Sequence, residues 1–286
     1  MQLTPAHITI LGGDVRYSYC AQQLRQAGWQ VDTFQVQGSP DTMALPGLFQ
    51  PQRDYLLPYP AFNARGYIPF LQGETILHCS DLIQGPITGS RFLCGRPGAF
   101  AQQLQNAGAQ VLDYEKDEFL TTANAIPTAE GALALAMQQM PDTLWESRCL
   151  VLGFGRVGKQ LSLRLQRLGA RVTVAVRNDA DRALLEALGL AHDTVAKYRS
   201  PLGQYRAIFN TVPAPVFTPA QYDTIDPACV LIDLASAPGG IDASQCLRRS
   251  LQFTHARGLP GKTAPATAGR LIAQTVARTL TEQEAL

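Results

Sequence analysis

Short apolar runs followed by a glycine turn, and then by apolar residues at helical spacing, recur along the chain. The clearest case joins the apolar run Cys149–Leu152 to the turn Gly153–Gly158. After the turn, apolar side chains recur three or four residues apart, at Val157, Leu161, Leu165 and Leu168. A short apolar run is typical of a buried strand, and the second spacing is typical of a helix with one buried face. This stretch therefore predicts a strand, a glycine turn and a helix.

The first part of the chain shows the same alternation. His7–Leu11 predicts a strand, Gly12-Gly13-Asp14 a turn, and the next residues to Ala27 a helix that Gly28 ends. Further apolar runs predict strands at Trp29–Phe34, Arg53–Leu57, Arg91–Cys94 and Gln110–Leu112, and a helix at Ala99–Ala107. Strands that alternate with helices form a parallel sheet with helices on its faces. We therefore expect an open α/β layer of about five strands, flavodoxin-like in outline.

The second part repeats the theme after the glycine turn. The predicted strands are Cys149–Leu152, Arg171–Val176, Ala207–Thr211, Cys229–Ala235 and Leu251–His255. Helices are predicted at Asp179–Leu188 and, at the end of the chain, Ala268–Leu280, which we expect to pack on the first domain. An apolar helix at Ala129–Met140, with Pro127 just before it, joins the two parts.

These elements predict an α/β protein with two doubly wound domains and a cleft between them. The first is a flavodoxin-like domain at 1–126, which the C-terminal helix 267–286 joins, and it lies on the substrate side. An interdomain helix at 127–144 follows, and a Rossmann NAD(P)-binding domain occupies 145–266.

Composition excludes several classes of function. The formal net charge is +1 with no cluster of Lys and Arg, so the chain carries no electrostatic signature of nucleic-acid binding. No apolar stretch approaches the roughly 20 residues that span a bilayer, and we expect no membrane partner. The six cysteines form no C-x-x-C pair and, with four histidines, no metal-ligand spacing. They favour a reducing cytoplasm, and we expect no metal.

The turn Gly153-Phe154-Gly155-Arg156-Val157-Gly158 fits the G-x-G-x-x-G pattern of dinucleotide sites. Gly153 permits the tight turn, Gly155 lets the backbone approach a pyrophosphate, and Gly158 lets the helix pack on the strand. The helix N-terminus offers N–H groups and partial positive charge to the phosphates. The alternative is a glycine turn that binds nothing.

The end of the second strand bears on the choice of dinucleotide. An acidic residue there holds the ribose of NAD, but this chain has Arg177 and Asn178. Arginine suits a 2′-phosphate by charge and by its paired N–H donors. We therefore predict NADP, with NAD as the alternative. Arg177 would otherwise stack on adenine or face water.

Three more stretches follow predicted strands, where ligands of open α/β sheets lie. Thr211, Val212 and Pro213 would run under the nicotinamide ribose. Leu234, Ala235 and Ser236 would approach the nicotinamide ring, and Leu259 with Pro260 would lie beside its carboxamide. The alternative for each is an ordinary turn.

The catalytic candidates are Glu130, Lys262 and Thr128. Glu130 is predicted at a helix N-terminus between the domains. The alternative is that it is only a negative charge that stabilises the start of the helix. Lys262 lies in a predicted Gly/Pro-flanked loop, either over an anionic substrate or in solvent. Thr128 and Asn124 would hydrogen-bond a substrate or cap the helix. For substrate binding we select Arg16, Asn124, Thr128 and Lys262. A histidine near the nicotinamide, His255, is more readily explained as a strand residue.

Together these motifs resemble a known family. The motifs are Gly12-Gly13-Asp14-x-Arg16, Asn124-x-Ile126-Pro127-Thr128-x-Glu130-Gly131, the glycine turn after Leu152, Asn210-Thr211-x-Pro213, Asp233-Leu234-Ala235-Ser236-x-Pro238-Gly239-Gly240 and Gly258-Leu259-Pro260-Gly261-x-x-Ala264-Pro265-x-Thr267-Ala268-Gly269. The set is similar to the A subunits of dipicolinate synthase, from about residue 7 to residue 280. The match is poorest over roughly 38–90.

The resemblance implies a function. Members of this family oxidise a dihydrodipicolinate, derived from the 4-hydroxy-tetrahydrodipicolinate of the lysine pathway, to dipicolinate in sporulating bacteria, with NAD(P) as acceptor. They work with a smaller, flavoprotein-like B subunit, and we also expect a homo-oligomer. A dicarboxylate substrate needs cations, for which Arg16 and Lys262 are the candidates.

Two other functions stay open. A D-2-hydroxyacid or amino-acid dehydrogenase would use the same fold, but the hydroxyacid enzymes need a His–Glu pair with an Arg, and His255 is the only nearby candidate. A non-catalytic scaffold subunit would bind the nucleotide and a partner without turnover.

Overall fold

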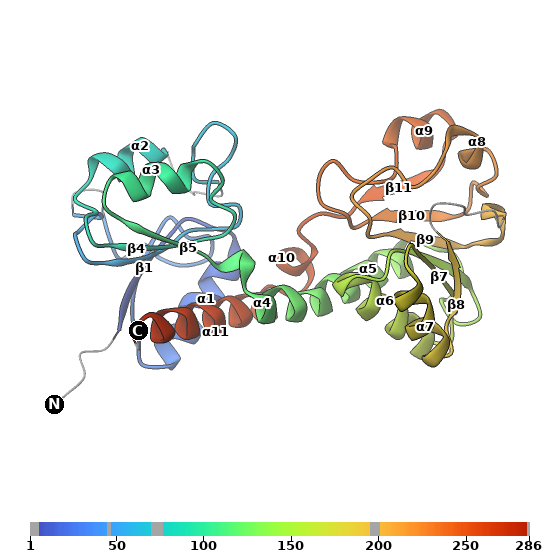
Figure 1. The fold of residues 1–286 in the computed structure, drawn as a ribbon, viewed down its shortest axis with the longest axis horizontal. Coiled ribbons are helices and arrows are strands. Elements are labelled where there is room, and N and C mark those ends of the chain that lie inside the picture. Colours follow the sequence, from blue (N-terminus) through green and yellow to red (C-terminus); the bar gives the residue numbers. More distant parts are fainter. Residues whose placement is uncertain (1–5, 45–46, 70–76, 195–200, 285–286) are drawn as a thin grey trace. The chain divides into compact units, whose positions relative to one another are not determined.

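The structure is a computed structural model that describes residues 6–44, 47–69, 77–194 and 201–284. The chain divides into two compact units (Figure 1). The first consists of 1–124 together with 264–286, and the second of 125–263. Each unit contains one parallel sheet with its own hydrophobic core.

The sheet of the first unit has five strands in the order β2-β1-β3-β4-β5, and all of its pairs are parallel. The strands are β1 His7–Leu11, β2 Gln30–Phe34, β3 Asp54–Leu56, β4 Arg91–Cys94 and β5 Gln110–Asp113. This order is that of flavodoxin-like folds, so the prediction from the strand pattern is confirmed.

Helices cover both faces of this sheet. The bounds are α1 Val15–Gln26, α2 Cys79–Gln84, α3 Phe100–Asn106, η1 Tyr114–Lys116, α4 Glu118–Ala123 and α11 Pro265–Glu284. On one face Ile8 and Ile10 pack with Leu24 of α1 and Val276 of α11. On the other face Tyr55 and Phe92 stack with ring centroids 4.8 Å apart, in the core that α2 and α3 complete.

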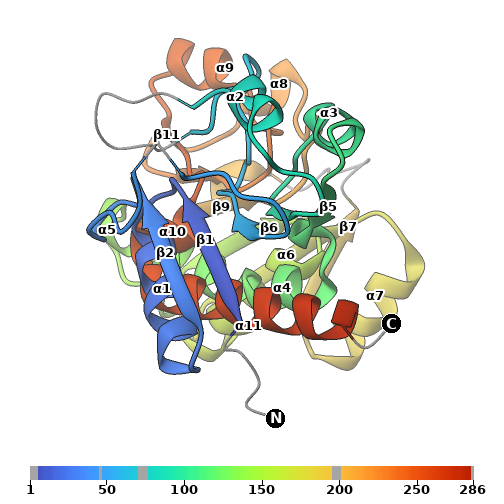
Figure 2. The same ribbon diagram turned by 90° about the vertical axis from the view of Figure 1, so that its left-hand side faces the viewer.

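The C-terminal helix α11 lies against α1, so residues from the two ends of the chain share one core (Figure 2). The contact is close because Gly269 has no side chain. A Cβ there would lie 2.3 Å from the carbonyl oxygen of Arg16 and 2.7 Å from Cβ of Tyr19.

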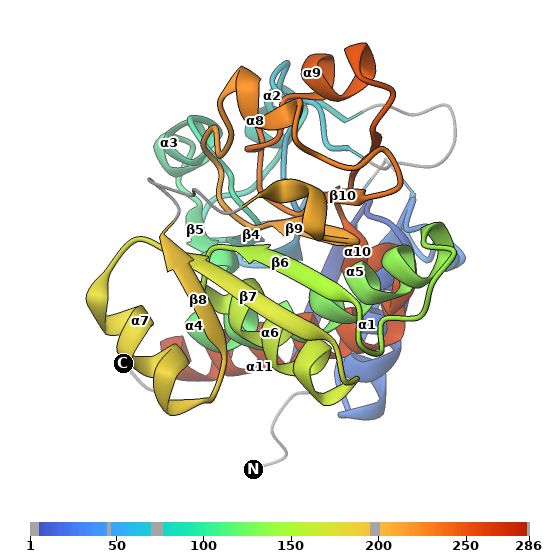
Figure 3. The same ribbon diagram turned by 90° about the vertical axis from the view of Figure 1, so that its right-hand side faces the viewer.

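The sheet of the second unit has six parallel strands in the order β11-β10-β9-β6-β7-β8 (Figure 3). The strands are β6 Arg148–Leu152, β7 Arg171–Val176, β8 Ala191–Thr194, β9 Ala207–Asn210, β10 Val230–Asp233 and β11 Gln252–His255. With β6 as its first strand this is the Rossmann order, which confirms the predicted fold class.

The helices of this unit are α5 Ala125–Gln139, α6 Arg156–Arg167, α7 Asp179–Ala187, η3 Leu202–Gln204, α8 Pro219–Tyr222, α9 Ala243–Arg248 and α10 Leu259–Thr263. Residues of α5, α6, α7 and α10 pack on one face of the sheet, around Val151, Val174 and Phe209. On the other face η3, α8 and α9 pack around Leu150, Ile208 and Leu231.

Several elements differ from the sequence prediction. The strand β8 was not predicted, because Ala-His-Asp-Thr is a partly polar strand at the edge of the sheet and lacks an apolar run. The helix α5 begins at Ala125, four residues before the predicted start. Leu259–Thr263 was predicted as a loop and is the short helix α10. Among the described residues no helix is long and apolar enough to cross a membrane.

Candidate functional site

A cavity of about 380 Å³ lies at the carboxyl ends of three neighbouring strands of the second unit. Its lining comes from the loops after β6, β7 and β9 and from the first turns of α6 and α7. The lining residues are Gly153, Phe154, Gly155, Lys159, Val176, Arg177, Asn178, Asp181, Thr211, Val212 and Pro213. The predicted glycine turn, the predicted 2′-phosphate residues and the loop after β9 thus meet in one cavity.

The three glycines of the turn each meet a different steric demand. Gly153 has a φ of +94°, which disfavours other residues, and a Cβ on it would lie 2.5 Å from Oγ1 of Thr211. A Cβ on Gly158 would lie 2.2 Å from the carbonyl oxygen of Gly153, so only glycine lets α6 start so close to β6. A Cβ on Gly155 would meet nothing within 4 Å. Gly155 therefore leaves the backbone open toward the cavity.

The N-terminus of α6 follows directly. Gly155 is its N-cap residue, and no side chain caps the helix there. Arg156, Val157 and Gly158 form its first turn, where backbone N–H groups and the helix dipole favour an anion. Buried side chains on the far side of the helix, such as Leu161 and Leu165, hold it against the sheet.

Charged and polar side chains at the end of β7 and in α6 and α7 line part of this cavity. Arg177 is exposed at the end of β7, and Lys159 of α6 has its Nζ 5.5 Å from the ring centroid of Phe154. Asn178 caps α7 by accepting from the backbone N–H of Asp181 at 2.7 Å, and its Nδ2 donates to the Asp181 carboxylate at 2.9 Å. Sequence reasoning missed Lys159 and Asp181, although Lys159 directly follows the third glycine.

The loop after β9 forms the opposite wall. Thr211 donates from Oγ1 to the carbonyl oxygen of Leu152 at 2.8 Å, which ties the loop to the end of β6. Val212 and Pro213 follow and face the cavity. The other predicted cofactor contacts do not line this cavity. Arg156, Val157 and Gly158 form the first turn of α6. Leu234, Ala235 and Ser236 follow the neighbouring β10, while Leu259 and Pro260 are buried in α10.

The substrate-side candidate Arg16 belongs to the first unit and is paired with Asp14. Its Nε donates to Oδ1 of Asp14 at 2.8 Å, and its Nη2 donates to Oδ2 at 2.8 Å. Burial opposes the charge of Arg16, but the hydrogen bonds to Asp14 and nearby charges outweigh it and raise the pKa above its ordinary value. The guanidinium is therefore a fixed cation at the start of α1, where Asp14 is also the N-cap.

Three tyrosines of the first unit have hydrogen-bonded hydroxyls, and the ring centroid of one of them, Tyr17, is 5.8 Å from Cζ of Arg16. The hydroxyls of Tyr17 and Tyr114 are 2.8 Å apart, and Tyr114 also donates to the carbonyl oxygen of Leu57 at 3.0 Å. Burial raises the pKa of Tyr17 to about 12. Tyr59 donates to Glu115 at 2.7 Å, and burial together with that carboxylate raises its pKa above the usual range. Burial also raises the pKa of Tyr114, so all three are neutral hydrogen-bonding groups at ordinary pH.

The catalytic candidates occupy positions that differ in part from the prediction. Glu130 lies in the second turn of α5, not at its N-terminus, because the helix starts at Ala125. It is 3.4 Å from Arg164 of α6. Thr128 lies on the first turn of α5, and Asn124 is the C-cap of α4. Lys262 is exposed on α10 rather than in a loop.

The histidine at the end of the last strand is hydrogen-bonded to an arginine. His255 accepts at Nε2 from Nε of Arg257 at 2.9 Å, and no hydrogen bond or ion pair found among the described residues joins it to a carboxylate. In those residues no cluster of three potential metal ligands occurs either. The dehydrogenase-type His–Glu pair is thus not seen in the described part of the chain.

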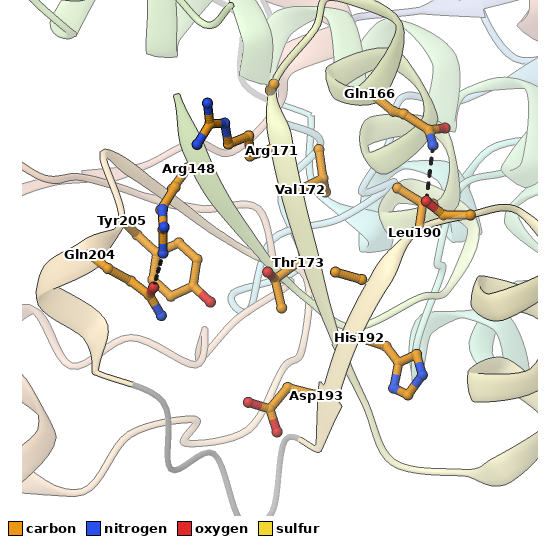
Figure 4. A pocket seen from close by; sticks show the side chains of 13 residues that line it. Arg148, Gln166, Arg171, Val172, Thr173, Leu190, His192, Asp193, Gln204 and Tyr205 are labelled. Carbon is orange, nitrogen blue, oxygen red and sulfur yellow. Dashed lines mark hydrogen bonds between the residues drawn. The ribbon is translucent and has the colours of Figure 1, made fainter. Parts of the chain in front are cut away.

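A larger hollow of about 510 Å³ lies elsewhere in the second unit (Figure 4). Arg148 and Arg171, the first residues of β6 and β7, line it together with His192, Asp193 and Tyr205. Arg148 is hydrogen-bonded to Gln204. Ligands of open α/β sheets bind at the carboxyl ends of the strands, so the smaller cavity at the glycine turn is the better candidate.

Comparison with known proteins agrees with the resemblance seen in the motifs. The chain is 28% identical over 299 residues to the A subunit of dipicolinate synthase from Bacillus subtilis (strain 168), covering 99% of this chain and 98% of that protein. The crystal structure of the dipicolinate synthase A chain from Bacillus subtilis matches with a TM-score of 0.86 and 26% identity, over 99% of this chain and 98% of that chain. The chain therefore resembles the A subunits of dipicolinate synthase along nearly its whole length.

A more distant match shows the fold alone. The apo-structure of D-lactate dehydrogenase from Escherichia coli matches with a TM-score of 0.60 and 13% identity, over 98% of this chain and 97% of that chain. The fold is thus shared with this solved structure. No family model matches the chain.

Proposed function

We propose that this protein is the NAD(P)-dependent oxidoreductase subunit of a dipicolinate synthase. The observation that carries the proposal is the cavity at Gly153–Gly155, in a chain that resembles the A subunits of dipicolinate synthase over 99% of its length. A dinucleotide would rest its pyrophosphate on the first amides of α6. Its adenosine would lie toward Arg177, and its nicotinamide toward Val212 and Pro213.

The reaction is the oxidation of dihydrodipicolinate to dipicolinate. The coenzyme supplies the acceptor, since C4 of its nicotinamide takes up a hydride. One C–H bond of the substrate ring loses that hydride, a second ring position loses a proton, and the products are dipicolinate, reduced coenzyme and H⁺. Formation of the aromatic ring favours the products. The protein's main task is therefore to hold the substrate ring and the nicotinamide ring in the orientation that hydride transfer needs.

We propose NADP as the preferred coenzyme. Arg177 stands where NAD-specific sites carry an acidic residue, and Lys159 adds a second cation to the cavity. Both cations favour a 2′-phosphate, while the carboxylate of Asp181 opposes it. Two cations against one carboxylate tip the balance toward NADP.

For the substrate we propose Arg16 and Lys262 as the cations that bind its carboxylates. Nη1 of Arg16 remains beside the two nitrogens that hydrogen-bond Asp14, and Lys262 presents its ammonium from α10. Asn124 and Thr128 would hydrogen-bond the same substrate. Glu130 is the candidate base, and its ion pair with Arg164 would keep the carboxylate in place. We expect a partner B subunit, and a homo-oligomer in the cytoplasm.

The test is an anaerobic incubation of the protein with the lysine-pathway intermediate, NADP and the partner B subunit. We expect equal amounts of reduced coenzyme and pyridine-2,6-dicarboxylate, measured by absorbance and by mass spectrometry. Gly158→Ala is the matched control, because its Cβ would collide with the carbonyl oxygen of Gly153 and displace the amides of α6. Absence of both products would overturn the proposal, and turnover of simple 2-oxo acids would favour a hydroxyacid dehydrogenase.

A further inference from the structure

A buried carboxylate at the end of β10 accepts four hydrogen bonds. Asp233 has no exposed surface. Its Oδ1 accepts from Nδ2 of Asn210 at 2.8 Å and from the backbone N–H of Ala235 at 3.0 Å. Its Oδ2 accepts from the backbone N–H groups of Gly240 at 2.8 Å and Ile241 at 3.0 Å. This one side chain therefore fixes both ends of the loop 234–241.

The partner Asn210 does the same for the neighbouring loop. It is also fully buried and lies directly opposite Asp233 in the β9–β10 ladder. Its Oδ1 accepts from the backbone N–H of Val212 at 3.0 Å, and its Nδ2 donates to the carbonyl oxygen of Val212 at 2.9 Å. The Asn210–Asp233 pair, which we call the strand-end clamp, thus joins the loops that follow β9 and β10.

The two loops are in direct contact at a glycine. A Cβ on Gly240 would lie 2.4 Å from the carbonyl oxygen of Val212 and 2.5 Å from Nδ2 of Asn210. The carbonyl oxygen of Gly240 also accepts from the backbone N–H of Val216 at 3.1 Å. Any movement of one loop would therefore be transmitted to the other.

A buried charge is a costly way to hold two loops together. Removing a carboxylate from water is unfavourable, and packed apolar side chains of similar volume often stabilise a protein as well or better. A fully satisfied polar network does, however, define positions more sharply than apolar contact. The value of the strand-end clamp therefore lies in the geometry it imposes.

That geometry bears on one end of the cavity. The strand order β9-β6-β7 places the glycine turn between Arg177 and the loop Thr211–Pro213. In the proposed function, a dinucleotide with its pyrophosphate at the turn and its adenosine at Arg177 would be held at its nicotinamide end by Val212 and Pro213. The strand-end clamp holds this second wall and has no atom in the cavity lining.

We propose that Asn210 and Asp233 are positioning residues that set the nicotinamide end of the coenzyme site without contacting the coenzyme. The inference rests on the proposed function, since it requires that a dinucleotide binds in this cavity. Different residues then recognise the adenosine end and the nicotinamide end of the coenzyme. The adenosine end depends on β7 and α7, and the nicotinamide end depends on the strand-end clamp.

The test compares two ligands that differ only at the nicotinamide end. Affinities for NADP and for 2′-phospho-ADP-ribose are measured by calorimetry on the intact protein and on Asp233→Asn. The amide would turn two accepted hydrogen bonds into clashes between donors, so we expect at least about tenfold weaker NADP binding. Binding of 2′-phospho-ADP-ribose should change by less than about twofold, since its contacts lie beyond the strand-end clamp.

Gly240→Ala carries the same test if Asp233→Asn does not fold, because its Cβ separates the loops from outside the cavity. Asp223→Asn is the control, since Asp223 is exposed and pairs only with Arg249 among its described contacts. Equal weakening of both ligands, or no change in either, would overturn the inference and leave the proposed function standing. If the unmodified protein binds neither ligand, the proposed function fails, and the inference fails with it.

Discussion

Arg177 and Asp181 line the same cavity with opposite charges, and in the proposed function their balance sets the choice between NADP and NAD. Arg177 is exposed at the end of β7, whereas Asp181 is partly buried and hydrogen-bonded to Asn178. An arginine binds a phosphate through paired N–H donors, while a carboxylate repels it. Substitutions of the two residues should therefore change the coenzyme preference in opposite directions.

Replacement of the arginine should change that preference. We expect Arg177→Leu to weaken NADP binding by about 10-fold to 100-fold, the effect of about 1.5 to 3 kcal/mol for a charged hydrogen bond, with little effect on NAD. Asp181→Asn should instead strengthen NADP binding a few-fold. Dissociation constants for both coenzymes measure this, with Arg182→Leu as control because Arg182 pairs with Asp179. Parallel losses for NADP and NAD would show that Arg177 does not read the 2′-phosphate.

The buried hydroxyl pair Tyr17–Tyr114 predicts a loss of stability in alkali. Burial raises the pKa of Tyr17 to about 12 in the folded protein, against about 10 in an unfolded chain. The folded state therefore holds this proton more tightly, so its contribution is complete below about pH 10 and is lost as the pH rises through about 12. At about pH 11 the loss from this group is of the order of 1 kcal/mol.

Tyr17→Phe should make the protein less sensitive to alkali. Urea unfolding of the first unit at about pH 8 and about pH 11 should show a smaller drop in the free energy of unfolding than in the unmodified protein. Tyr19→Phe is the control, since Tyr19 lies on the same helix and is 37% exposed. An identical drop in Tyr17→Phe and the unmodified protein would remove Tyr17 from the alkaline transition.

Strands with apolar runs and long helices could be predicted from the sequence, and helices of six residues or fewer could not. The apolar runs at Cys149–Leu152 and Arg171–Val176 are central strands buried on both faces, so their sequences are almost wholly apolar. Helices α2, α8 and α9 have six residues or fewer and are set by caps and packing rather than by periodicity. The same limit explains α10, whose Leu-Pro-Gly sequence suggests a loop until Leu259 and Pro260 are seen to be buried.

The residues of the candidate site divide in the same way, into those that a local motif marks and those that only the fold brings together. The glycine turn and Arg177 could be predicted as cavity residues because their positions depend on local backbone and on a fixed offset from the turn. Lys159 and Asp181 reach the cavity from helix positions that no motif marks. The strand-end clamp depends on the pairing of β9 with β10, which are separated by 19 residues between Asn210 and Val230. Asn210 and Asp233 belong to the sequence motifs, but only the structure shows the hydrogen bonds that they make.

The packing of α1 on α11 predicts the effect of one added methyl group. Alanine favours a helix over glycine by about 1 kcal/mol. In Gly269→Ala, however, the methyl would lie 2.3 Å from a backbone oxygen of α1, and overpacking of this kind costs about 1 to 3 kcal/mol or more. The clash should dominate and lower the melting temperature of the first unit. Arg270→Ala, on the exposed side of α11, is the control, and a stabilised Gly269→Ala would contradict the close contact.

At the scale of the whole molecule, the first unit is built from both ends of the chain and the second from one continuous segment. Residues 125–263 contain the complete sheet β6–β11 and every residue that lines the cavity. The first unit, in contrast, needs α11, because Leu271, Ile272 and Val276 complete its core. Only the second unit is therefore a candidate for independent folding.

A fragment of residues 125–263 should fold and bind NADP with a dissociation constant within about fivefold of the intact protein, because the whole cavity lies inside it. It should not oxidise substrate, since Arg16 and Asn124 are missing. A fragment that begins at residue 145 is the matched control. It lacks α5, whose Ala129, Ala132 and Ala136 are buried in the core, so it should expose apolar surface and aggregate. If both fragments bound NADP equally well, α5 would not belong to the folding unit of the Rossmann sheet. If the longer fragment folded without binding NADP, the cavity at the glycine turn would not suffice for the coenzyme, and the proposed function would lose its main support.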